Sequence, residues 1–74
     1  MHEQEPAYVV CIDNSAYPAS LELRKIYTCL PDARAEGDGL VRVIDESGED
    51  YLYPAKYFVP IRVPEAVERS FKAG

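Results

Sequence analysis

The sequence predicts an all-β domain: a small five-stranded barrel with a 3-10 turn before the last strand and a short C-terminal helix. Its 74 residues suffice for one domain and leave no room for a second. Its apolar residues gather in short runs typical of β-strands. The connections are too short for the crossover helices of a parallel sheet. We expect residues 1–7 as a flexible tail, 8–63 as the barrel, and 64–74 as a helix or tail.

The first strand is predicted at residues 8–12, a run of β-branched, aromatic and apolar side chains. The polar residues 13–15 end it, because such side chains bond to their own backbone in turns. Residues 17–23 lack a clear period and are expected to form a long ordered loop, with Leu21 and Leu23 turned inward.

The second strand is predicted at residues 25–30, and Pro31 ends it. The following connection, residues 31–39, is polar and contains two glycines. One helical turn is expected within it, at residues 32–36. The apolar run at residues 40–44 is predicted to be the third strand.

A tight hairpin is expected at residues 45–50, where Gly48 supplies a positive φ. It leads into a fourth strand at residues 51–53. Residues 54–57 begin with a proline, which has no N–H for the strand ladder, so a 3-10 turn is expected there. The fifth strand follows at residues 58–63.

Proline also sets the place of the fifth strand. Pro60 confines it to a sheet edge or to a position where its nitrogen faces outward. Either Phe58 or Val59 is then its first inward residue. The final helix is predicted to start at a proline and to carry Val67 and Phe71 on one face, a frayed tail being the alternative.

The order of these elements resembles that of the SH3 domain. Residues 52–58, Leu-Tyr-Pro-Ala-Lys-Tyr-Phe, resemble the Leu-Phe-Pro-Ser-Asn-Tyr-Val segment that precedes the last strand of that family. Residues 21–27 stand in place of its Leu-x-Phe-x-x-Gly-Asp segment, and residues 38–42 in place of its Asp-Gly-Trp-Trp-Lys. The resemblance covers residues 8–63 and implies an SH3-like barrel.

SH3 domains bind proline-rich peptides in an aromatic groove. The resemblance places the two first-strand tyrosines of that groove at Ile12 and Asn14 and its tryptophan at Leu40, while Pro54 and Tyr57 keep their identities. It therefore implies the fold more than the ligand. The chain is also similar to small bacterial or phage proteins with a Cys-Ile-Asp-Asn start and an Asp-Glu-Ser-Gly-Glu-Asp-Tyr-Leu-Tyr-Pro hairpin, which implies no particular activity.

The leading functional hypothesis is a protein- or peptide-binding module. In an SH3-like barrel, Tyr17 of the long loop and Tyr57 of the 3-10 turn would lie near each other, with Leu40, Pro54 and Lys56 close by. A mixed apolar and aromatic patch of this kind is typical of contact surfaces. The anchors would be Tyr17, Pro54 and Tyr57. In the alternative structural interpretation, the C-terminal helix folds over this patch and covers it.

Charge limits the partners. Thirteen acidic and eight basic residues give a net charge of -5. This disfavours nucleic acids and acidic membranes, and no run approaches the roughly 18 apolar residues of a membrane span. Two alternatives remain. One is a nucleic-acid- or ribosome-associated domain using Arg24, Lys25, Arg42 and Arg62; the other is a self-assembling subunit paired through an edge strand. We expect a monomer or a weak homo-oligomer.

We expect no enzymatic activity, no cofactor and no bound metal. His2 is the only imidazole, and the sequence has no nucleophile elbow, no Cys-x-x-Cys and no phosphate-binding glycine loop. A domain this small rarely encloses the roughly 300 Å³ of a substrate pocket. The polar, acidic start favours a cytoplasmic protein, with Cys11 and Cys29 as reduced core residues. A disulfide between their two strands is the alternative.

Overall fold

The structure, a computed structural model, describes residues 7–73, the last two by their backbone alone. The expected tail before residue 7, including His2, lies outside the described residues. Five strands form one antiparallel sheet, which confirms the predicted strand content. The strands are β1 (Ala7–Cys11), β2 (Ile26–Leu30), β3 (Leu40–Ile44), β4 (Asp50–Pro54) and β5 (Phe58–Ile61). The other elements are the helices α1 (Ala33–Gly37) and α2 (Glu65–Ala73) and the 3-10 turn η1 (Ala55–Tyr57).

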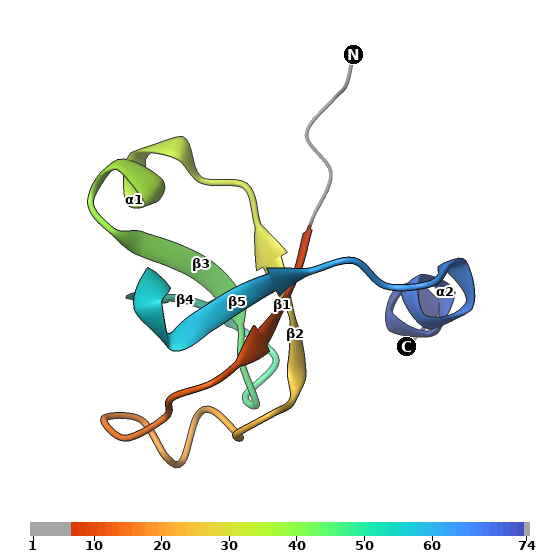
Figure 1. The fold of residues 1–74 in the computed structure, drawn as a ribbon, viewed down its shortest axis with the longest axis horizontal. Helices are drawn as coiled ribbons and strands as arrows, with labels where there is room; N and C mark the ends of the chain where they lie inside the picture. Colours follow the sequence, from red (N-terminus) through yellow and green to blue (C-terminus); the bar gives the residue numbers. More distant parts are fainter. Residues whose placement is uncertain (1–6, 74) are drawn as a thin grey trace.

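The sheet has the strand order β4-β3-β2-β1-β5 and is strongly curled. β2 pairs with β1 along residues 26–29 but with β3 only through Cys29 and Leu30, so it is shared by two halves of the sheet. The edge strands β4 and β5 are joined by η1 alone (Figure 1). This link spans at most about 14 Å, whereas the outer strands of a flat five-stranded sheet lie about 19 Å apart. The sheet is therefore curled, and among the described strands no pairing between β4 and β5 closes it.

The core draws on all five strands, the long loop and the 3-10 turn. Its buried members are Val9, Cys11, Leu21, Tyr27, Val43, Tyr53, Tyr57 and Phe58. Leu21 comes from the long loop and is fully buried, as predicted. Leu23, also expected inside, is 41% exposed, so that expectation is wrong. The chain reverses immediately after it, because Arg24 takes a left-handed conformation with φ of 63° and its N–H donates to the carbonyl of Cys11 (2.7 Å).

The last strand has the predicted edge position. Pro60 lies in β5 opposite Val9 of β1, and β5 pairs with β1 alone in the described sheet. Phe58 is buried and Val59 is exposed, so Phe58 is the inward residue of the two. Gly48 in the β3–β4 turn has φ of 85°, as the hairpin prediction requires.

Each helix is fixed by one main contact. Asp32 accepts the N–H of Ala35 at the start of α1 and also binds the Nε of Arg42 on β3 (2.8 Å), which attaches α1 to the sheet. α2 contacts β1 through Phe71, whose ring stacks on Tyr8 with 5.1 Å between centroids. Figure 1 shows α2 to the right of the sheet, away from residues 12–25. The helix α2 does not cover Tyr17 or the loop that carries it, so the interpretation of a helix that folds over the predicted patch is wrong.

Cys11 and Cys29 are free thiols on neighbouring strands. Cys29 lies opposite Ala7, four residues along β1 from Cys11. At about 3.3 Å per residue this offset is about 13 Å, beyond the roughly 7 Å limit for a disulfide. The alternative of a disulfide between the two strands is therefore wrong for this fold. Neither helix of the described residues has the length and apolar character that a membrane crossing requires.

Candidate functional site

The long loop, residues 12–25, is held in place by hydrogen bonds. The side-chain amide of Asn14 donates to the carbonyl of Leu21 across the loop (2.9 Å). The N–H of Glu46 in the β3–β4 turn donates to the carbonyl of Ser20 (3.1 Å). Leu21, which follows Ser20, is also buried in the core, so this part of the loop is attached both to the β3–β4 turn and to the core. Side chains that it carries outward therefore form a preformed surface.

Tyr17 is the aromatic side chain that this loop presents to solvent, with 41% of its surface exposed. Its ring meets that of Tyr53 at 5.0 Å between centroids and an interplanar angle of 82°. It also meets Tyr57 at 6.1 Å and 63°. Edge-to-face contacts of this kind are favourable because the positive ring edge meets the negative ring face. The ring of Tyr17 therefore packs against two buried core tyrosines.

The remaining residues of the predicted patch differ in accessibility. Leu40 and Pro54 face each other across β3 and β4 and are both half-buried. Lys56 is exposed in η1. Tyr57 is only 7% exposed, because η1 turns its ring into the core beneath Tyr17. Tyr57 thus supports the surface from below and offers little area to a partner, contrary to its expected use as an anchor.

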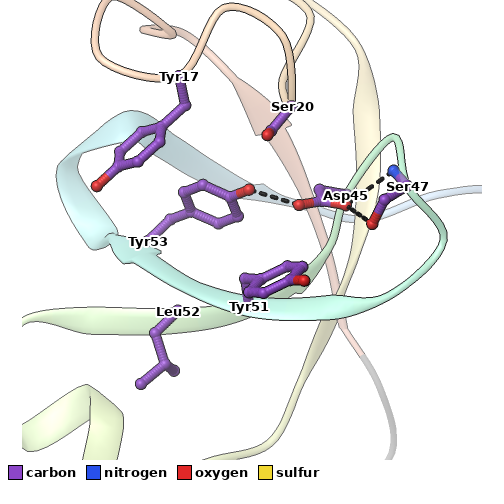
Figure 2. A pocket seen from close by; sticks show the side chains of 7 residues that line it. All are labelled: Tyr17, Ser20, Asp45, Ser47, Tyr51, Leu52 and Tyr53. Atoms are coloured by element: carbon purple, nitrogen blue, oxygen red, sulfur yellow. Dashed lines mark hydrogen bonds between the residues drawn. The ribbon is translucent and has the colours of Figure 1, made fainter.

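A recess that the sequence did not reveal lies between the long loop and β4. It has a volume of about 340 Å³ and is formed by Tyr17, Ser20, Asp45, Ser47, Tyr51, Leu52 and Tyr53. We call it the tyrosine recess. Figure 2 shows Tyr53 at its centre, with Tyr17 and Ser20 on one side and Tyr51 on the other. Sequence alternation in β4 does place Tyr51 and Tyr53 on one face, which was the available signal.

Asp45 organises the inner end of the tyrosine recess. It is only 6% exposed. The hydroxyl of Tyr53 donates to its Oδ2 (2.5 Å), and both the N–H (2.9 Å) and the hydroxyl (2.6 Å) of Ser47 donate to its Oδ1. Burial alone would raise the pKa of Asp45, but these hydrogen bonds outweigh burial and hold the pKa below its ordinary value. Burial and the bond to Asp45 raise the pKa of Tyr53 to about 12, so it remains a donor at neutral pH.

Glu46 forms a second network beside the first. Its Oε2 accepts from the Nζ of Lys25 (2.6 Å) and from the hydroxyl of Tyr27 (2.5 Å). Lys25, and after it Tyr27, hold the pKa of Glu46 below its ordinary value. Arg42 is likewise paired, with Asp32 and with Asp50. Two of the four basic residues considered for nucleic-acid binding are thus engaged with carboxylates of this chain.

The recess is lined by tyrosines, two serines, a leucine and one carboxylate. Its two serines lie beside a carboxylate that already accepts hydrogen bonds, and no histidine occurs among residues 7–73. No group of three or more metal-ligating side chains occurs among the described residues. The recess, of about 340 Å³, is a depression open to solvent and not an enclosed pocket.

Comparisons of the chain with protein families, with curated proteins and with solved structures found no significant match.

The stability of the domain is expected to fall in acid. The pKa values of Asp32, Asp45 and Glu46 are all lowered in the folded state. The unfolded chain then binds more protons, so stability rises with pH. This contribution is complete above the ordinary carboxyl pKa of about 4 and is lost as the pH falls through the folded-state values.

Urea unfolding followed by circular dichroism at a series of pH values measures this effect. We expect a midpoint that changes little near pH 7 and falls steadily below about pH 4.5. Asp45→Asn should show a lower midpoint at neutral pH and a shallower fall, because one of the carboxyls with a lowered pKa is gone. A midpoint that held or rose between about pH 5 and about pH 3 in the unmodified chain would contradict the assignment.

Proposed function

We propose that this chain is a non-enzymatic module that binds a protein or peptide, and that the tyrosine recess is the centre of its contact surface. One observation carries the proposal. Tyr17 and Tyr51 line the recess with 41% and 51% of their surfaces exposed, while Tyr53 between them is buried. Exposed aromatic side chains grouped around a preformed hollow are typical of partner contacts.

The rigidity of the recess supports the proposal. Its loop side is attached through Ser20 to the β3–β4 turn, and its inner end is fixed by Asp45. A preformed site loses less conformational entropy on binding than a mobile one, so more of the contact energy appears as affinity. Leu40, Pro54 and Lys56, which the sequence analysis placed in the contact patch, do not line the recess. We assign them to the rim of the contact surface.

We further propose that the fold is an SH3-like barrel. The strand order, the sharing of β2 between two half-sheets and the η1 turn between the two edge strands support this reading. Proline-rich peptides are not the ligand that we infer, because Leu40 stands where that groove needs its tryptophan. We place the protein in the cytoplasm, where free thiols such as Cys11 and Cys29 remain reduced.

Selection from a phage library of random twelve-residue peptides on the immobilised full chain tests the binding function. Selected peptides are synthesised, and their affinities are measured by isothermal titration calorimetry with wild type, Tyr51→Ser and Val59→Thr. Val59 is exposed on the β5 edge and outside the recess, which makes it the matched control. Proton–nitrogen NMR spectra establish that each variant is folded.

We expect peptides with micromolar dissociation constants, at about -8 kcal/mol, that bind Tyr51→Ser about tenfold more weakly and Val59→Thr unchanged. A library that yields no specific peptide would refute the binding module. Peptides whose affinity is affected equally by both variants, or by Val59→Thr alone, would move the contact surface away from the recess.

A further inference from the structure

We propose that the tyrosine recess takes a basic side chain, lysine or arginine, of the bound protein or peptide. This inference rests on the proposed function and specifies its ligand chemistry. The site differs from the expected aromatic groove, because its lining includes Tyr17 but none of Leu40, Pro54, Lys56 and Tyr57.

The rings around the recess present faces that a cation can approach. The planes of Tyr17 and Tyr53 meet at 82° in an edge-to-face contact and Tyr53 is buried, so the ring surface open to a ligand is that of the exposed Tyr17 and Tyr51. Figure 2 shows Tyr51 across from Tyr17, with the ring of Tyr53 between them. Organic cations bind to aromatic faces through the ring quadrupole, and the interaction strengthens as water is excluded. The methylene stem of lysine or arginine would pack on the same rings.

The charge at the inner end of the recess has the sign that a cation needs. Asp45 is buried and lines the recess, and its carboxylate stays ionised at neutral pH because Ser47 and Tyr53 donate to it. The β3–β4 turn and the start of β4 hold three more acids, Glu46, Glu49 and Asp50. Two cations, Lys25 and Arg42, pair with members of this group. Acids thus exceed their basic partners beside the recess, and the whole chain carries -5.

Other ligand classes fit this recess less well. A carboxylate or phosphate would be repelled by Asp45 and the acids of the turn. A purely apolar side chain would gain nothing from the acids of the turn, which attract a cation. A hard metal ion needs several oxygen ligands, and Asp45 is the only carboxylate that lines the recess, with both of its oxygens already accepting hydrogen bonds.

Titration of the nitrogen-15-labelled full chain with matched peptides tests the inference. The probes are acetyl-Gly-Ser-X-Ser-Gly-amide peptides in which X is lysine, arginine, norleucine or glutamate. Norleucine has the same stem as lysine without the charge. We expect the lysine and arginine peptides to bind in the millimolar range, at about -4 kcal/mol. Their shifts should centre on Tyr51, Tyr53 and Ser47. Binding should weaken several-fold when salt rises from about 20 mM to about 200 mM.

Variants separate the contributions of ring and charge. Tyr51→Phe should keep the lysine affinity within about twofold, because a ring face remains, while Tyr51→Ala should weaken it about fivefold to tenfold. Asp45→Asn should weaken lysine binding about tenfold and leave norleucine unaffected. Val59→Thr is the control that changes neither. Since Asp45→Asn also destabilises the fold, the exposed Tyr51 variants keep the test decisive if Asp45→Asn does not fold.

The outcomes distinguish this inference from the proposed function. Binding of norleucine as strong as that of lysine, or no binding of either basic peptide, overturns the inference. If the phage selection nevertheless yields peptides that depend on Tyr51 and lack basic residues, the binding module stands and its ligand chemistry is different. If both experiments yield no binding at the recess, the proposed function falls as well.

Discussion

Tyr57→Ala is expected to lower the free energy of unfolding by about 3–5 kcal/mol. The ring of Tyr57 is 7% exposed and packs with the core on one side and with Tyr17 on the other. Removing it leaves a hollow at the η1 turn, which also holds the two edge strands of the sheet together. A domain of this size has a total stability of about 4–11 kcal/mol, so the variant should be partly unfolded at 37 °C. Urea unfolding followed by circular dichroism measures the loss.

Tyr57→Phe is the control for that experiment. It keeps the packed ring and removes only the hydroxyl, so we expect a change below about 1 kcal/mol. A Tyr57→Ala protein as stable as wild type would show that Tyr57 contributes little to the core. In practice, a binding defect in Tyr57→Ala would say nothing about a contact surface, because loss of fold would explain it. Tyr51 and Tyr17, which are exposed, are the informative positions.

Asp45→Ala is expected to lower the free energy of unfolding by about 2–4 kcal/mol. The substitution leaves the buried hydroxyl of Tyr53 and the N–H of Ser47 without their acceptor. A buried donor that loses its partner keeps the full cost of desolvation, which exceeds the net value of the hydrogen bond itself. Thermal or urea unfolding at pH 7 measures the loss.

A double-mutant cycle with Tyr53→Phe shows whether the two residues act together. Tyr53→Phe keeps the core ring and removes the donor to Asp45. We expect the losses of the two single variants to sum to more than that of the double variant, with a coupling energy of about 1 kcal/mol or more. Simple additivity would mean that the short contact between Tyr53 and Asp45 contributes no coupling to stability.

Local rules were sufficient for most of the backbone. Each predicted strand appears within two residues of its expected bounds, because apolar runs and turn-forming residues set both ends. Gly48 was expected to supply a positive φ and Pro60 to lie in an edge strand, and the structure shows both. The helical turn expected at residues 32–36 is present as α1, and the structure shows that Asp32 caps its start.

The candidate site was less accessible to sequence reasoning, because it depends on contacts between distant segments. Asp45 is one of four acids in the β3–β4 hairpin, and nothing in the sequence marks it as the one that the Tyr53 hydroxyl reaches from eight residues away. Tyr57 has the residue type of an interface anchor, but the curl of the sheet turns it inward. Tyr51 is on the same face of β4 as Tyr53 but beyond the end of the core, so alternation alone does not tell which of the two is exposed.

The two edges of the sheet differ in what they offer to another strand. At the middle of β5, Pro60 has no N–H, so an incoming chain cannot complete a regular ladder along that edge. Within β4, proline occurs only at the last position, so most of that edge retains its donors. Fibril-like growth needs two competent edges per molecule, one for each neighbour. This sheet has one such edge, so association of native molecules through strand addition would stop at a pair.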